Sequence, residues 1–320
     1  MSFCGPVVLV LLVAIWDFGL TLGAALIIHP ALGASVANSS GATPTDFITA
    51  LQAGGNSTSI VGSGELSPQT GAFRLFYLFA SLTGTAIVSL TLTYLMQVYS
   101  ALRSRNSTAL QFHLASAETG DAAEFVAGLG PQGKFDGGYS NLSEMAVKIS
   151  EAKEAHHFYP VLFNFRFSET HYSVSRFALV ALDSVTLIKS ALDDRKYEWL
   201  KESAGVAHLW RACMLLLTNL AENFLPGETG KMQPDERKRE RWHRRYQAAL
   251  EKFRQAGIET IADERAGFEI YVSLRAEWDD SIASLAPLLG YELEEIDPAG
   301  RRPESAAGRQ DFRARSHSAG

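Results

Sequence analysis

Two long apolar runs lie in the first third of the chain, and the remainder places apolar residues at helical spacing. The first run, residues 6–28, reads PVVLVLLVAIWDFGLTLGAALII and contains a single charge, Asp17. The second begins at Phe73, has aromatic residues at both ends and continues to residue 102. Each run is at least as long as the roughly 20 residues that cross a bilayer. The pattern predicts two transmembrane helices, at 6–28 and 73–102.

A cleaved signal peptide is the alternative interpretation of the first run, because the ASVA ending at Ala37 resembles a cleavage site. Three features favour a retained helix instead. No Lys or Arg precedes the run, its apolar stretch is longer than that of a signal peptide, and Asp17 interrupts it. We therefore expect a transmembrane helix.

The segment between the two runs predicts a short helix followed by a glycine-rich loop. Thr43 is placed to cap a helix that has Pro44 at its first position and an acid three residues after the cap. A Gly-Gly pair at 54–55 is a typical helix end. The prediction is a helix at 44–54 and a loop at 59–66 that contains the sequence VGSGE.

Basic residues predict the orientation of the two spans. No Lys or Arg occurs between His29 and Phe73, whereas Arg103 and Arg105 follow the second span. Cytoplasmic flanks of membrane helices are enriched in Lys and Arg. Both termini are therefore expected in the cytoplasm, with the intervening loop outside, in a multi-pass protein of the cell membrane.

The rest of the chain predicts a cytoplasmic helical domain over residues 104–295 and a disordered tail over 296–320, where apolar residues are few. One helix of this domain contains the apolar stretch ACMLLLTNL. Arg211 and Glu222 leave it an apolar core of only about ten residues, too short to cross a bilayer. We expect a buried core helix there, not a third span.

Composition excludes several classes of function. The chain has 320 residues, a net charge of −6 and two cysteines, Cys4 and Cys213. Two cysteines favour neither a disulfide framework nor a cysteine-based zinc site, and the mild acidity gives no reason to expect nucleic acid as a partner. The adjacent His156 and His157 cannot form a helical metal-binding pair. No nucleophile triad or nucleotide fingerprint is present, so we expect no enzyme activity and no cofactor or structural metal.

The order of span, short helix, Gly-x-Gly segment and span resembles the two-transmembrane pore module of the potassium-channel superfamily, as found in bacterial potassium-channel-like proteins. The likeness is strongest over residues 6–106. It implies an all-α membrane protein with two transmembrane helices, a re-entrant pore helix and a filter loop, followed by a cytoplasmic helical domain. The hexapeptide IVGSGE stands where the superfamily carries T-V-G-Y-G-D: Val61, Gly62 and Gly64 match, and Ile60, Ser63 and Glu65 replace Thr, Tyr and Asp.

The resemblance implies a subunit of a passive cation channel, permeable to monovalent cations such as K⁺, that forms a homotetramer in membrane lipid. In that superfamily the filter Tyr packs against aromatic residues of the pore helix. Ser63 replaces this Tyr, and Phe47 is the only aromatic partner that the predicted short helix offers. We therefore expect a cation preference with weak discrimination of K⁺ from Na⁺.

Two interpretations remain open for each of two residues, Gly84 and Asp17, and for the function of the protein. Gly84, midway along the second span, is either a gating hinge or a point of close helix packing. Asp17 is either a pore-lining acid or a hydrogen-bonded contact near Trp16 or Thr21. The alternative function is a non-conducting, membrane-anchored interaction or sensory protein derived from a channel, with an unknown cytoplasmic partner.

Overall fold

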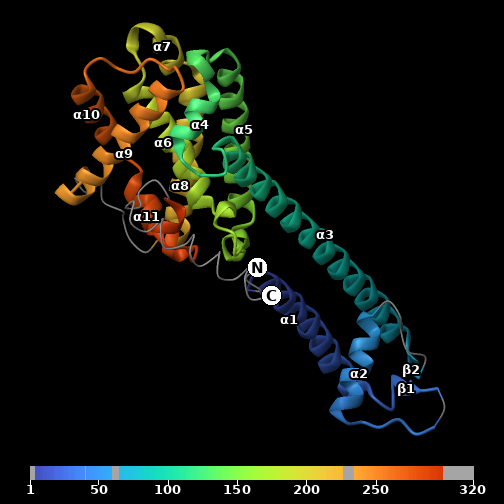
Figure 1. The fold of residues 1–320 in the computed structure, drawn as a ribbon. Helices are drawn as coiled ribbons and strands as arrows, with labels where there is room; N and C mark the ends of the chain where they lie inside the picture. Colours follow the sequence, from blue (N-terminus) through green and yellow to red (C-terminus); the bar gives the residue numbers. More distant parts are fainter. Residues whose placement is uncertain (1–3, 40, 60–64, 226–233, 298–320) are drawn as a thin grey trace, which may run out of the picture. The chain divides into compact units, whose positions relative to one another are not determined.

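The computed structural model describes residues 4–39, 41–59, 65–225 and 234–297. Over these residues the protein is helical apart from one two-stranded sheet (Figure 1). The chain divides into two compact units between Ser100 and Ala101, close to the boundary expected at residue 103. We call residues 4–100 the membrane unit and residues 101–297 the helical domain.

The membrane unit has a small core at the C-terminal end of its first helix. Its elements are α1 (Cys4–Ile28), a 3-10 turn (His29–Ala31), β1 (Val36–Asn38), α2 (Phe47–Thr58), β2 (Leu66–Pro68) and the first part of α3 (Gly71–Ala115). The strands pair antiparallel, with Val36 opposite Pro68. Side chains from α1, α2 and both strands form the core, namely Ala25, Ile28, Leu32, Val36, Ala50, Ala53 and Leu66.

Three helices in the described part of the chain are long and apolar enough to cross a membrane: Val10–Ala31, α3 and α8 (Ala204–Phe224). In the first two, only 17% and 11% of the apolar window is buried within the protein. Trp16, Leu82 and Leu90 each expose more than half of their surface. Apolar surfaces of this extent mark contact with lipid or with other protein chains. The two helices therefore indicate a membrane-associated protein.

The third apolar helix, α8, is packed differently. In its apolar window 44% is buried, and it packs against α5 (Asp136–Phe158) and α6 (Val174–Ala191). Buried residues recur along one face at helical spacing, while His208, Arg211 and Glu222 lie exposed on the other. This amphipathic packing is typical of a core helix, as the charges around its short apolar stretch led us to expect.

α2 begins and ends later than the predicted range of 44–54. Asp46, not Thr43, is its N-cap: the carboxylate accepts hydrogen bonds from the backbone N–H and the hydroxyl of Thr49, at 3.0 and 2.8 Å. The Thr43 hydroxyl instead accepts from the backbone N–H of Asn38 at 2.8 Å and so joins the loop to β1. The Gly-Gly pair that was expected to end the helix lies inside it. Gly54 of this pair packs against the backbone of α1.

α3 extends 13 residues beyond the predicted end at residue 102. Packing within the helical domain explains the extension, because one face of this part is buried, at Leu102, Arg105, Thr108, Ala109 and Phe112. The Arg105 guanidinium donates hydrogen bonds to the carbonyls of Leu162 and Phe165, at 2.9 and 3.1 Å. Of the two basic residues that indicated the orientation, only Arg103 is therefore exposed.

The helical domain is built around α6. Its other elements are α4 (Ala122–Leu129), α5, α7 (Asp194–Lys201), α8, α9 (Glu236–Gln255), α10 (Glu264–Arg275), α11 (Asp279–Leu288) and α12 (Leu293–Ile296), with 3-10 turns at Pro131–Gly133, Pro160–Asn164 and Thr170–Tyr172. α6 contacts α4, α8, α9, α10 and α11 (Figure 1), and nearly all of its residues are buried. Its hydroxyls at Ser184, Thr186 and Ser190 donate to carbonyls four residues earlier, so these buried polar groups are satisfied.

A buried ionic cluster fixes the C-terminal end of the helical domain. Asp183 on α6 pairs with Arg245 on α9 and with Arg275 on α10, each at 2.7 Å. Asp297 pairs with the same two guanidinium groups. The predicted boundary of the disordered tail at 296 is therefore wrong for Ile296 and Asp297: Ile296 belongs to the apolar core of the domain, and Asp297 is buried where it pairs with both arginines. Residues 298–320 lie outside the described residues.

A buried, unpaired histidine makes the stability of this domain pH-dependent. His156, near the end of α5, is only 2% exposed, and within the described structure neither of its ring nitrogens has a hydrogen-bond partner. Burial, and secondarily the nearby Arg105 guanidinium, lowers the pKa of His156 to about 3. An unfolded histidine titrates near pH 6.5. Between these two values a proton binds the unfolded chain but not the folded one, so stability is complete above about pH 6.5 and falls as the pH decreases.

We predict that His156→Leu removes this part of the pH dependence. Between pH 7.5 and pH 5, the free energy of unfolding of wild type should fall by about 2 kcal/mol more than that of the variant. Denaturant unfolding of the full chain, followed by fluorescence of the four tryptophans in the helical domain, measures the difference. His157→Leu, at the exposed neighbouring position, is the matched control and should retain the wild-type dependence. Equal pH dependence of wild type and His156→Leu would contradict the assignment.

Candidate functional site

α2 runs back along α1 in the opposite direction. Phe47, at the start of α2, lies beside His29, just past the end of α1, with ring centroids 5.8 Å apart. Two turns later, Gly54 touches the α1 backbone at Thr21 and Ala25. A Cβ atom on Gly54 would lie 2.7 Å from the carbonyl oxygen of Thr21, so only glycine permits this approach. α2 therefore extends alongside the apolar segment of α1 (Figure 1).

The C-terminal end of α2 meets the first third of α3, at Gly84. A Cβ atom on Gly84 would lie 1.9 Å from the carbonyl oxygen of Thr58, so the two backbones are in direct contact. At a rise of 1.5 Å per residue, Gly84 lies about 20 Å from the start of α3 at Gly71. The contact therefore lies within the apolar stretch of α3. Of the two interpretations of Gly84, close packing describes the contact, and a hinge stays a prediction.

Two hydroxyl groups stabilise this end of α2. The Ser57 hydroxyl donates to the Gly54 carbonyl at 2.8 Å, and the Thr58 hydroxyl lies 3.2 Å from the carbonyls of both Gly54 and Gly55. Ser57 and Thr58 are buried. The last carbonyls of a helix have no intrahelical donor and carry a partial negative charge. A helix end of this kind favours cations in its vicinity.

Most of the filter-like segment falls outside the described residues: Ile60, Val61, Gly62, Ser63 and Gly64. Its last member, Glu65, is described and exposed. The Glu65 carbonyl accepts a hydrogen bond from the backbone N–H of Ser39 at 2.9 Å, directly before β2. The segment therefore starts at the α2 end beside Gly84 and finishes at the sheet beside the C-terminal end of α1.

Carboxylates are the only formal charges between the two spans. Asp46 and Glu65 are both exposed, and no Lys or Arg occurs between His29 and Phe73. The hydrogen bonds from Thr49 hold the pKa of Asp46 below its usual value, so this carboxylate is ionised at neutral pH. Negative charge near a pore mouth raises the local concentration of cations.

Two other residues singled out from the sequence have different surroundings from those expected. Phe47 lies against His29 and is 42% exposed; the expected loss of its contact with the filter at Ser63 stays a prediction, because Ser63 is outside the described residues. Asp17 faces a groove between α1 and α3. Among the described residues it makes no hydrogen bond with another helix, whereas an interhelical contact near Trp16 or Thr21 was one of the two expectations.

No family model, curated protein or solved structure matches this chain. The interpretation of the site therefore depends on its geometry and chemistry.

The glycine contacts can be tested by substitution with alanine. Gly84→Ala should force α2 and α3 apart, because the added Cβ meets the Thr58 backbone, and such overpacking costs about 1–3 kcal/mol. We expect a lower midpoint of thermal unfolding in detergent. Gly19→Ala and Gly71→Ala are the controls, since no atom lies within 4 Å of a Cβ at either position. Alanine in an open helix stabilises by about 0.5–1 kcal/mol relative to glycine, so the controls should be neutral or raise the midpoint. A rise for Gly84→Ala equal to that of Gly19→Ala would disprove the contact.

Proposed function

We propose that this chain is the subunit of a passive cation channel of the potassium type. The observation that carries the proposal is the backbone contact between the end of α2 and Gly84, within the apolar stretch of α3 and directly before the segment that contains VGSGE. Non-helical backbone at membrane depth is tolerated only where it is buried in protein or lines a water-filled path. Residues 59–64 connect this end to Glu65, whose carbonyl is bonded to Ser39 beside β1, and the positions of these two ends support a filter between them.

The chemistry of the segment favours cations. Gly62 and Gly64 permit backbone angles that let successive carbonyl oxygens face one axis, and rings of carbonyls replace the water around an ion. The negative end of α2 points to the same region. The exposed carboxylates of Asp46 and Glu65 add to the cation preference.

The proposed pore is a homotetramer in the cell membrane, with both termini in the cytoplasm. A single copy has one VGSGE segment, and one strand of carbonyls cannot surround an ion. The exposed apolar surfaces of α1 and α3 leave room for lipid and for neighbouring subunits. Lys and Arg are absent between the spans, which supports an outside location for that loop.

The purified protein should assemble as a tetramer in mild detergent and release K⁺ from loaded liposomes. Gly62→Val should abolish this flux while leaving the tetramer intact, because a branched side chain blocks the backbone angles of the filter. Glu277→Gln, at an exposed position in the helical domain, is the matched control and should conduct like wild type. A protein that remains monomeric in lipid and releases no K⁺ would contradict the proposal.

Ion discrimination tests the role of Ser63. Serine is too short to wedge the filter against α2, so the carbonyl rings should be held loosely and distinguish K⁺ from Na⁺ poorly. Under bi-ionic conditions, with K⁺ on one side and Na⁺ on the other, we predict a reversal potential close to zero. Ser63→Tyr alone should leave it little changed, because Phe47 is the only aromatic residue in α2. A strongly K⁺-selective wild type would show that the glycine backbone is sufficient.

One observation favours the second candidate, a non-conducting, membrane-anchored interaction protein. The helical domain has its own core and exposes large apolar side chains at Val147, Trp199 and Leu215. Such exposed residues are common where proteins bind partners. A stable tetramer without ion flux, combined with loss of partner binding in Trp199→Ala, would support this function in place of conduction.

A further inference from the structure

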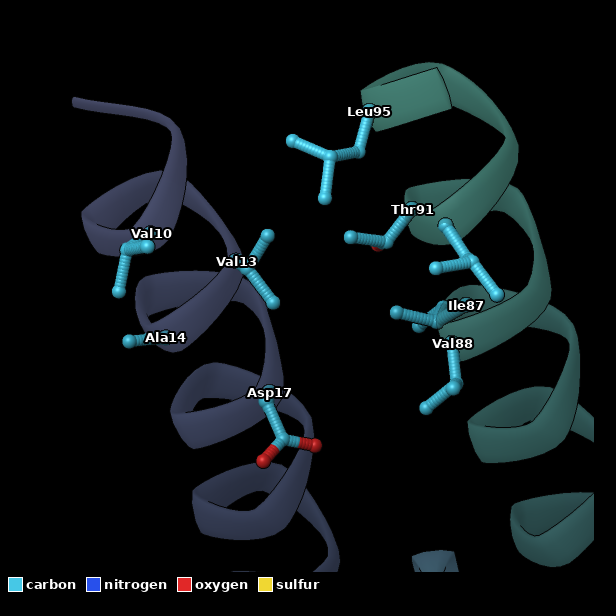
Figure 2. A pocket seen from close by; sticks show the side chains of 9 residues that line it. Val10, Val13, Ala14, Asp17, Ile87, Val88, Thr91 and Leu95 are labelled. Carbon is cyan, nitrogen blue, oxygen red and sulfur yellow. The ribbon is translucent and has the colours of Figure 1, made fainter. Parts of the chain in front are cut away.

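A groove between α1 and α3 in the membrane unit contains a single charged residue. Its volume is about 490 Å³, within the range of small-molecule sites. Figure 2 shows Val13 and Asp17 of α1 facing Ile87, Thr91 and Leu95 of α3 across it. Apart from Asp17 and Thr91, every side chain that lines this groove is apolar. The groove therefore combines an apolar wall with one carboxylate.

The chain supplies no positive charge for this carboxylate. Among the described residues Asp17 has no ion-pair partner. The only basic residues in the first 100 are His29 and Arg74. His29 lies about 18 Å along the helix from Asp17 at the usual rise per residue, and Arg74 is bound to the Pro68 carbonyl near the start of α3. An unpaired charge at this depth is costly, and intramembrane acids usually have a partner.

We propose that the groove binds an organic ammonium ion with an apolar body. Its charged nitrogen pairs with the Asp17 carboxylate, and its hydrocarbon part lies against Val13, Ile87 and Leu95. Charge complementarity favours this occupant. Ca²⁺ and Mg²⁺ take six or more oxygen ligands, whereas Asp17 and Thr91 are the only lining residues with side-chain oxygen. A second copy of the membrane unit brings no basic side chain to this depth, because the same two basic residues are the only ones it has.

Binding at this groove is independent of ion conduction, so the two proposals can fail separately. Trp16 provides a local reporter: it lines an adjoining groove that shares Val13, Ile87 and Thr91 with the first. The other four tryptophans, at 199, 210, 242 and 278, belong to the helical domain. A bromine-labelled ligand in the groove quenches Trp16 by contact, and Trp16→Phe identifies this part of the signal.

The test uses the full chain in phosphatidylcholine nanodiscs with two brominated probes of equal length, 11-bromoundecyltrimethylammonium and the neutral 11-bromoundecanol. Wild type should show saturable quenching of Trp16 by the ammonium probe, at concentrations about tenfold lower than for the alcohol. Asp17→Asn should abolish this preference without changing quenching by the alcohol, and Asp17→Glu should restore it. Glu277→Gln, which removes an exposed carboxylate of the helical domain, is the matched control and should bind both probes like wild type.

Three results would overturn the proposal. Quenching by the ammonium probe that rises without saturation would mean that the probe only partitions into lipid. Equal affinity of wild type and Asp17→Asn for the ammonium probe would mean that the carboxylate does not select the charge. A change of oligomeric state in Asp17→Asn, measured by size-exclusion chromatography with light scattering, would mean that a second copy of the chain occupies the groove.

Discussion

The membrane unit depends on two close backbone contacts, at Gly54 with α1 and at Gly84 with α3. Together they hold a short helix against two long apolar ones. A side chain at either position would meet backbone atoms, which cannot move aside as the end of a flexible side chain can. Glycine at both positions therefore lets α2 approach α1 and α3 closely. The contact fixes the position of the α2 end, which carries the negative end of the helix dipole and precedes the glycine-rich segment.

The positions of the two apolar helices and the end of α1 could be predicted from the sequence, but the end of α3 and the contacts between helices could not. α1 ends at Ile28 as expected, because a run of apolar residues is a local property. The start of α2 was predicted wrongly because both Thr43 and Asp46 are good caps, and the choice between them depends on Asn38, whose N–H uses the Thr43 hydroxyl. Gly54 was interpreted as a helix end because a Gly-Gly pair is typical of one. Its packing partner on α1 is about 30 residues away in the sequence, so the residues around Gly54 do not indicate this contact.

The same limit applies to the ionic cluster and to α3. Asp297 lies in a polar stretch that is typical of a disordered tail, and only its pairing with Arg245 and Arg275 explains its burial. Likewise Arg105 is a membrane-flanking charge in the sequence and a buried donor to two carbonyls in the structure. The filter-like segment was identified from its glycines, and its two described ends are compatible with that interpretation. The conformation of Ile60 to Gly64 lies outside the described residues.

Asp183 and Asp17 differ in how the charge of the carboxylate is compensated. Asp183 is completely buried and is compensated by two guanidinium groups and by the Tyr271 hydroxyl, which donates to it at 2.8 Å. Asp17 lies in an apolar helix, and no basic residue of the membrane unit comes near it. Removing one partner from a buried ion pair is strongly destabilising. The first aspartate therefore contributes to a stable core, whereas the second leaves a charge that a ligand can satisfy.

The central claim is that α2 doubles back beside α1 into the depth of the apolar layer. A disulfide between Thr21→Cys and Gly55→Cys tests it directly, because a Cβ on Gly55 would be in contact with the Thr21 side chain, 3.6 Å from its Cγ2. In native membranes, with Cys4 and Cys213 replaced by serine, we predict efficient oxidation of this pair, detected by mass spectrometry of the linked peptides. Thr21→Cys with Ile48→Cys, at the start of α2, should remain reduced. Efficient cross-linking of residues 21 and 48, with none between 21 and 55, would contradict the account.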